Sequence, residues 1–157
     1  MTENMTPKAM SSLQQVTIIM IEDDPGHAML IEKNLRRAGI ANHIVALDNG
    51  RKAIEYFTGS GEYADHKLPE SMLILLDLNL PEIDGFEILK QLKSSPATHL
   101  IPIIILTTTD NPREVERAYE LGCNIYVTKP IVYDNFAESI RKLGLMLTVV
   151  QVPTLEH

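Results

Sequence analysis

The stretch from Met72 to Pro81 reads MLILLDLNLP, an apolar run that ends in a carboxylate, with an amide two residues later and a closing proline. A run of this length between turn signals is typical of a strand buried on both faces, as in parallel sheets. Asp77 would then lie at the carboxyl end of a buried strand, where open α/β sheets place their ligand sites. Because burying an unpaired charge is unfavourable, this carboxylate needs a partner or a function.

Short apolar runs alternate with helical patterns along the rest of the chain. We expect strands at residues 16–21, 43–47, 72–76, 101–106 and 124–128. Helical spacing follows each strand, and the helices are expected to begin at Pro25, after Gly50, at Gly85, at Asn111–Pro112 and at about Asp134. Strict alternation of strands and helices predicts an α/β fold, in which helices cover both faces of one five-stranded parallel sheet.

The 157 residues are most simply one domain with a sizeable core. Residues 1–15 are polar and unpatterned, so we expect a flexible N-terminal tail. The domain is expected over residues 16–152, with a long surface loop at 58–71 and an apolar C-terminal extension. Residues 153–157 are expected to form a tail, because Leu155-Glu156-His157 resembles the start of an expression-tag scar.

Composition and charge exclude several function classes. The formal net charge of -7 argues against sequence-independent binding to nucleic acid or to an anionic membrane surface. No apolar run approaches the roughly 20 residues of a membrane span, so we expect a cytoplasmic location. Cys123 is the single cysteine, which excludes an internal disulfide and a cysteine-rich zinc site. Its side chain is predicted to be a small buried group.

Polar and charged residues follow most of the predicted strands. They are Glu22-Asp23-Asp24 after the first strand, Asp77 after the third, Thr107 after the fourth and Lys129 after the fifth. The carboxyl ends of parallel strands share one edge, and acids gathered there would repel one another and resist ionisation. Mg²⁺ and a fixed ammonium would remove that conflict, since Mg²⁺ prefers oxygen ligands. The set favours phosphoryl chemistry, in which a carboxylate attacks phosphorus and cations neutralise charge.

Four segments carry a family resemblance: Ile21-Glu22-Asp23-Asp24-Pro25, Leu76-Asp77-Leu78-Asn79-Leu80-Pro81 with Asp84-Gly85, Ile105-Leu106-Thr107, and Tyr126-Val127-Thr128-Lys129-Pro130. In this order and spacing, over residues 17–147, the chain resembles the receiver domain of two-component response regulators. The resemblance implies a flavodoxin-like, doubly wound fold with five helices and strand order 2-1-3-4-5. The long loop at 58–71 is similar to that of single-domain regulators that partner phytochrome-type histidine kinases.

The resemblance implies a role for the acids that match the family pattern. Asp77 would be the phosphoacceptor and would form an acyl phosphate. Glu22, Asp23 and Asp77 would hold Mg²⁺, with Mn²⁺ as a substitute, and Asn79 would offer its backbone carbonyl to the same ion. Asp24 is better explained as the cap of the first helix than as a ligand.

The resemblance also implies a conformational switch. Thr107 would be the switch hydroxyl, and Lys129 the ammonium that pairs with the phosphoryl group. Tyr126 would move inward with the switch, although its position also suits a half-buried strand aromatic. The Lys129–Pro130 peptide is expected to be cis. His27 lies in the first helical turn, just beyond the acids, and has no assigned role.

The predicted function is a single-domain response regulator in a phosphorelay: a signalling protein and not an enzyme. The expected partners are a sensor histidine kinase, with the phytochrome type among the candidates, or a phosphotransfer protein, and neither nucleic acid nor membrane. The apolar run at residues 143–152 predicts a homodimer through the last helix and its extension. The alternative is a phosphorylation-independent docking module, against which the intact acids, Thr107 and Lys129 count. A magnesium-dependent phosphatase would need a second acid shortly after Asp77, where Asn79 stands.

Overall fold

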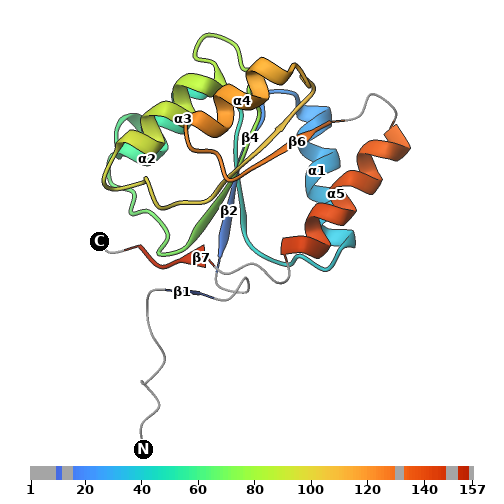
Figure 1. The fold of residues 1–157 in the computed structure, drawn as a ribbon. Helices are drawn as coiled ribbons and strands as arrows, with labels where there is room; N and C mark the ends of the chain where they lie inside the picture. The colour runs from blue at the N-terminus through green and yellow to red at the C-terminus, as the bar shows by residue number, and fades with distance from the viewer. Residues whose placement is uncertain (1–9, 12–15, 130–132, 148–151, 156–157) are drawn as a thin grey trace, which may run out of the picture.

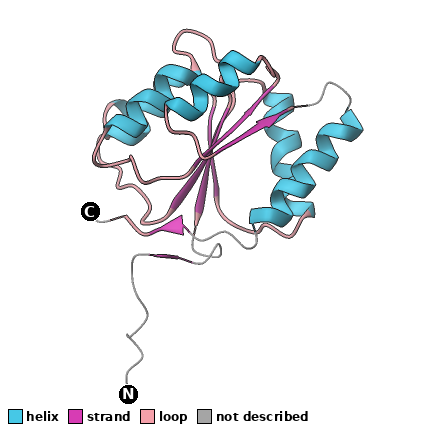
Figure 2. Cartoon of the chain, viewed as in Figure 1, coloured by secondary structure: helices cyan, strands magenta, loops and turns pink. Residues whose placement is uncertain are grey.

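The computed structural model describes residues 10–11, 16–129, 133–147 and 152–155. At its centre is a five-stranded parallel sheet (Figures 1 and 2). The strands are β2 (Thr17–Ile21), β3 (Ile44–Leu47), β4 (Met72–Leu76), β5 (Ile103–Thr107) and β6 (Ile125–Thr128). Their spatial order is β3-β2-β4-β5-β6, which is order 2-1-3-4-5 when these five strands are numbered along the chain. The predicted doubly wound sheet is confirmed.

Five α-helices cover the two faces of this sheet within the described residues. They are α1 (Pro25–Arg37), α2 (Gly50–Thr58), α3 (Gly85–Ser94), α4 (Pro112–Glu120) and α5 (Tyr133–Leu147). Figure 1 shows α1 and α5 together on one face and α2, α3 and α4 on the other. Alternate residues along each strand therefore enter two separate cores: Ile19 and Ile21 pack on the three-helix side, while Ile18 and Met20 pack on the two-helix side.

Side-chain caps fix where the first two helices begin. The carboxylate of Asp24 accepts hydrogen bonds from the backbone N–H groups of Gly26 and His27, which confirms its role as a cap of α1. Asn49 caps α2 in the same way by accepting from the N–H of Lys52. The cap of Asp24 places α1 directly after the acids that follow β2.

The central strand β4 is buried along its whole length, and α3 packs closely against its end. Gly85, the first residue of α3, lies so close to the chain after β4 that an added Cβ would overlap the backbone oxygen of Asp77. The same Cβ would lie 2.5 Å from the Cα atom of Leu78. Only glycine fits this approach, so the Asp84-Gly85 pair holds the end of β4, and with it Asp77, against a fixed helix.

The structure differs from the expected tails near both ends of the chain. Short strand β1 (Met10–Ser11) pairs antiparallel with β7 (Val152–Pro153), although we expected tails at residues 1–15 and 153–157. Val152 is buried in the core, and the N–H of Leu155 donates to the carbonyl of Glu70. Burial of Val152 explains why this segment is held against the domain. Residues 1–9, 12–15 and 156–157 lie outside the described part.

Two smaller differences concern loops. The segment between α2 and β4 includes the 3₁₀ turn η3 (Gly61–Tyr63). The fourth strand begins at Ile103 and not at Ile101, because the N–H of Ile101 donates to the carbonyl of Thr98 in a preceding turn.

Cys123 is buried, as predicted. Within the described residues, no helix is both long and apolar enough to cross a bilayer.

Candidate functional site

The polar residues that follow separate strands meet at the carboxyl edge of the sheet. Glu22 follows β2, Asp77 follows β4, Thr107 ends β5 and Lys129 follows β6. All four side chains are buried, with Thr107 fully inaccessible and Asp77 7% exposed. Buried charge is unfavourable unless it is paired, so the contacts among these residues decide what the site can do.

Lys129 neutralises the centre of the cluster. Its ammonium forms a buried ion pair with the carboxylate of Glu22 and lies 3.1 Å from Oδ2 of Asp77. Oδ1 of Asp77 accepts a hydrogen bond from the backbone N–H of Asn79, at 3.0 Å. Each oxygen of the Asp77 carboxylate is therefore held by a separate donor, and the side chain has a fixed orientation.

Three acids are arranged as a cation-binding group. Glu22, Asp23 and Asp77 each offer one carboxylate oxygen, and these oxygens all lie within 4.8 Å of one another. An all-oxygen set of few carboxylates, with Asp23 partly open to solvent, suits Mg²⁺ because this ion keeps several waters. The predicted role of the Asn79 backbone carbonyl as a further ligand stays a prediction.

Burial changes the protonation of Glu22. The pKa of the Glu22 carboxyl is raised to about 7, chiefly because burial desolvates it; the hydrogen bond and the charge of Lys129 lower this pKa, and the charge of Asp77 raises it. Near neutral pH the site is therefore poised between a bound proton and a bare carboxylate. A bound divalent cation would favour the carboxylate.

Magnesium binding is expected to strengthen as the pH rises through 7. Below the Glu22 pKa of about 7 the folded protein holds a proton that the cation must displace. The half-saturating Mg²⁺ concentration should therefore fall by up to about tenfold per pH unit below that pKa and level off above it. Calorimetric titration in buffers of different ionisation enthalpy measures both the affinity and the protons released. The variant Glu22→Gln should bind more weakly, without this pH dependence; an affinity equal at pH 6 and 8 in the wild type would contradict the prediction.

The side chain of Asn79 has a role that the sequence did not suggest. Its amide Nδ2 donates to the hydroxyl of Thr107 at 3.1 Å and to that of Thr108 at 3.2 Å. The sequence predicts only a backbone role for Asn79. An amide placed two residues after Asp77 was the available signal, but its partners lie on the neighbouring strand and could not be inferred from local spacing. The buried Thr107 hydroxyl is thus held by an amide beside the Asp77 carboxylate.

Comparison with known proteins identifies the family. The model of the response regulator receiver domain matches residues 18–141, which is well over half of the chain. The chain belongs to the response regulator receiver family. Response regulator Rcp1 of Synechocystis is 38% identical over 112 residues, which cover 71% of this chain and 75% of Rcp1. This receiver therefore acts in phosphorylation-based two-component signalling, and receivers of this family partner with histidine kinases or phosphotransfer proteins.

Solved structures show the same fold over most of this chain. A receiver domain from Rhodospirillum rubrum is 52% identical, with a TM-score of 0.83 over 90% of this chain and 99% of that chain. The Mn²⁺-bound form of Rcp1 is 32% identical, with a TM-score of 0.81 over 88% and 99%. The phosphorylated cyanobacterial phytochrome response regulator RcpA is also 32% identical, with a TM-score of 0.78 over 90% and 98%. Both Rcp1 and RcpA are single-domain regulators.

Tyr126 connects the edge of this receiver to α4. Its ring lies on β6 and is partly buried, and its hydroxyl donates to the carbonyl of Thr109 at 2.7 Å. Its backbone N–H donates to the hydroxyl of Tyr119 on α4, at 3.1 Å. Burial raises the pKa of Tyr126 to about 12, so the phenol stays neutral and acts as a donor. The inward movement of this ring stays a prediction. Pro130, and with it the predicted cis peptide, lies outside the described residues.

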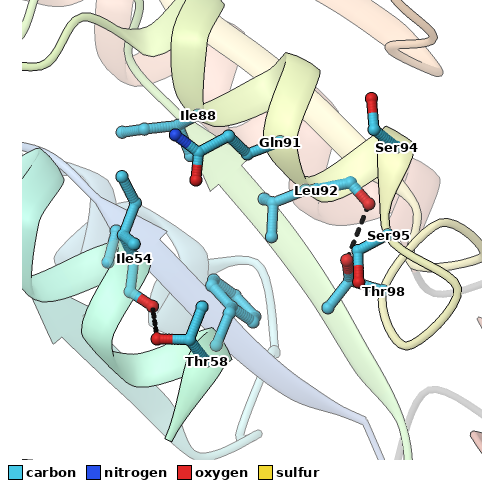
Figure 3. Close-up of a pocket in the computed structure, with 10 residues that line it drawn as sticks. Ile54, Thr58, Ile88, Gln91, Leu92, Ser94, Ser95 and Thr98 are labelled. Carbon is cyan, nitrogen blue, oxygen red and sulfur yellow. Dashed lines mark hydrogen bonds between the residues drawn. The ribbon is translucent and has the colours of Figure 1, made fainter. Parts of the chain in front are cut away.

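A separate cavity of about 310 Å³ lies between α2 and α3 (Figure 3). Its lining is mainly apolar, with Ile54 on α2 facing Ile88 and Leu92 on α3. The hydroxyls of Thr58 and Thr98 at its rim donate to the carbonyls of Ile54 and Leu92. Among the residues that the structure describes, no charged side chain lines this cavity, and none of the residues of the acid cluster does. It is therefore unsuited to phosphoryl chemistry.

Proposed function

We propose that Asp77 of this receiver accepts a phosphoryl group from a phosphohistidine of a sensor kinase or phosphotransfer protein. One oxygen of the Asp77 carboxylate would attack phosphorus, the phosphorus–nitrogen bond would break, and an acyl phosphate would form while the imidazole leaves. The observation that carries this proposal is the fixed, buried carboxylate of Asp77, held by Lys129 and by the Asn79 N–H beside two further acids.

The other residues of the cluster neutralise charge during this transfer. Mg²⁺ held by Glu22, Asp23 and Asp77, with the Asn79 carbonyl as a further ligand, would offset the charge of the transferring group. The likeness to the Mn²⁺-bound form of Rcp1 supports such a site and the use of Mn²⁺ as a substitute. Lys129 already points its ammonium at Asp77 and would pair with the new phosphoryl oxygens.

The switch would follow from the added charge. A phosphoryl group brings roughly -1.5 to -2 charge and strong acceptor oxygens. The Thr107 hydroxyl accepts a hydrogen bond from the amide of Asn79 before phosphorylation. It would turn towards the phosphoryl oxygens, and this hydrogen bond would break. Tyr126 would then repack, and the face made by α4, β6 and α5 would change shape. Signalling through this face would be by contact with another protein.

Incubation with Mg²⁺ and a small acyl-phosphate donor tests the proposal. Intact mass should rise by one phosphoryl group, and addition of a chelator before the donor should prevent the gain. Reduction of the acyl phosphate with borohydride, followed by peptide mapping, should place the modification at Asp77. No gain in the presence of Mg²⁺, or a gain at another residue, would reject it. The first outcome would favour the phosphorylation-independent docking module, which the present geometry does not support.

The partner of this receiver is proposed from its relatives. Likeness to RcpA, a phytochrome response regulator, and to a bacteriophytochrome response regulator that is 34% identical supports a phytochrome-type histidine kinase as the phosphoryl donor. Transfer from such a kinase, compared with an unrelated histidine kinase at equal concentration, would test this choice. Faster transfer from the unrelated kinase would contradict it. The acidic net charge of -7 favours protein partners over nucleic acid or membrane.

We also propose that the receiver forms a homodimer through α5 and the segment that follows it. Leu143 and Leu147 are buried in the core, but Leu145 and Met146 on the same helix are 49% and 36% exposed. Exposed apolar side chains on one helix are typical of an interface. Light scattering over a concentration series should show a dimer, and Leu145→Lys should shift it to the monomer. A monomer mass at all concentrations, with and without phosphorylation, would reject the dimer.

A further inference from the structure

His27 lies in the first turn of α1, and its ring faces the buried ammonium of Lys129. The distance from Nδ1 of His27 to Nζ of Lys129 is 3.3 Å. The same Nδ1 lies 3.9 Å from Oδ2 of Asp24, beyond hydrogen-bond distance. Because an ammonium has three N–H donors and no acceptor, the imidazole nitrogen must accept. This contact therefore requires the tautomer in which Nδ1 carries no proton.

With His27 counted, the ammonium of Lys129 is fully engaged. It has three donors, and they point at the carboxylate of Glu22, at Oδ2 of Asp77 and at Nδ1 of His27. Two of these partners are acids, and their contacts with Lys129 would change when a cation and a phosphoryl group bind. His27 is the third partner, and it is not one of the acids that could hold a cation. It is thus the contact that can keep Lys129 in place while the other two contacts change.

The imidazole of His27 also contacts α5. The rings of His27 and Phe136 pack edge to face, with centroids 5.8 Å apart and an interplanar angle of 88°. Phe136 is buried on α5, and Figure 1 shows α1 and α5 side by side on the same face of the sheet. His27 therefore touches both the ammonium at the carboxyl edge and a core residue of α5.

We propose that His27 is a positioning residue for phosphoryl transfer, whose Nδ1 holds the Lys129 ammonium against Asp77. The proposal rests on the proposed function of Asp77 as phosphoacceptor. The ring contact with Phe136 fixes the imidazole, and through it the ammonium. If His27 only filled space between the helices, a ring without a nitrogen would serve equally well. The acceptor and the ring can be removed separately, which distinguishes the two roles.

Two variants separate the contributions of the acceptor and the ring. His27→Phe keeps an aromatic ring beside Phe136 but removes the acceptor, whereas His27→Asn keeps an amide oxygen near the position of Nδ1 and removes the ring. With Mg²⁺ and saturating acyl-phosphate donor, we expect His27→Phe to gain its phosphoryl group about tenfold more slowly, the loss expected for one hydrogen bond to a charged group. His27→Asn should retain most of the wild-type rate. The Mg²⁺ concentration for half-maximal rate should stay unchanged in both, because His27 is not a ligand.

Controls make each outcome decisive. A His27→Phe rate equal to the wild type, or an equal loss in both variants, would overturn the positioning role. Failure of the phosphoacceptor assignment would look different, because the wild type itself would then gain no phosphoryl group or would gain it away from Asp77. Thermal unfolding followed by circular dichroism reports whether each variant is folded. If Phe does not pack, His27→Leu also lacks an acceptor, and the same slow rate is expected from it.

Discussion

The variant Asp77→Asn is expected to gain no phosphoryl group under conditions that modify the wild type completely. An amide oxygen is a far weaker nucleophile than a carboxylate, and loss of a nucleophile reduces rates on the order of 10³-fold or more. The substitution also places either an NH₂ group or a neutral oxygen before the ammonium of Lys129, which lies 3.1 Å from Oδ2 in the wild type. Intact mass spectrometry of both proteins, sampled over the same time course, measures the loss.

Asp84→Asn is the matched control for this substitution. Asp84 lies in the same loop and caps α3 by accepting from the N–H of Glu87 at 3.0 Å. Asn is an equally good cap, so α3 should keep its position and phosphorylation should proceed at the wild-type rate. An equal phosphoryl gain in Asp77→Asn and the wild type would remove Asp77 as the acceptor. Loss in both variants would show that the loop geometry, and not the nucleophile, had been damaged.

Lys129→Met is expected to destabilise the protein strongly in the absence of divalent cations. The ammonium is buried and contacts the carboxylates of Glu22 and Asp77, so its removal leaves two buried acids without a counter-charge. Removal of one partner from a buried ion pair lowers the free energy of unfolding by about 3–5 kcal/mol. Mg²⁺ should restore part of this loss and should bind more tightly than in the wild type, because the competing cation is gone. Urea unfolding with chelator or with Mg²⁺ measures both effects.

Lys52→Met provides the comparison for Lys129→Met. Lys52 on α2 is partly exposed, and its ammonium lies 3.3 Å from Oδ1 of Asp48; a surface pair of this kind contributes little to stability. Its removal should leave both the free energy of unfolding and the effect of Mg²⁺ close to those of the wild type. A similar, small decrease in the free energy of unfolding of the two variants would mean that Lys129 does not neutralise the acids around it.

The sequence of strands and helices, and the residues that meet at the site, could be predicted because both depend on local patterns and on one rule of topology. In each strand and helix the apolar residues recur at the spacing typical of that element, and a parallel sheet brings the carboxyl ends of its strands to one edge. Glu22, Asp77 and Lys129 are more than 50 residues apart in sequence, yet their positions after three strands were sufficient to place them together. Burial of those strands explains why the side chains are fixed.

Contacts between irregular segments could not be predicted in this way. The pairing of β1 with β7 joins two residues from each end of the domain, and so short a strand has no measurable period. The loop after α2 lies mainly on the surface, as expected, but the ring of His66 packs against that of Tyr56 with centroids 4.3 Å apart, and its Nε2 is buried. Such packing depends on the three-dimensional path of the loop. The hydrogen bonds of the Asn79 amide to Thr107 and Thr108 could not be predicted for the same reason.

The β1–β7 pair lies at the amino edge of the sheet, since Leu155 bonds to Glu70 just before β4 begins, whereas Asp77 follows the other end of that strand. A fluorescent reporter or a surface tether joined beyond residue 155 would therefore leave the domain from the side opposite to the phosphoacceptor. An immobilised receiver of this design would present its reactive edge to a kinase in solution. A bulky reporter inserted after residue 129 would instead obstruct that edge.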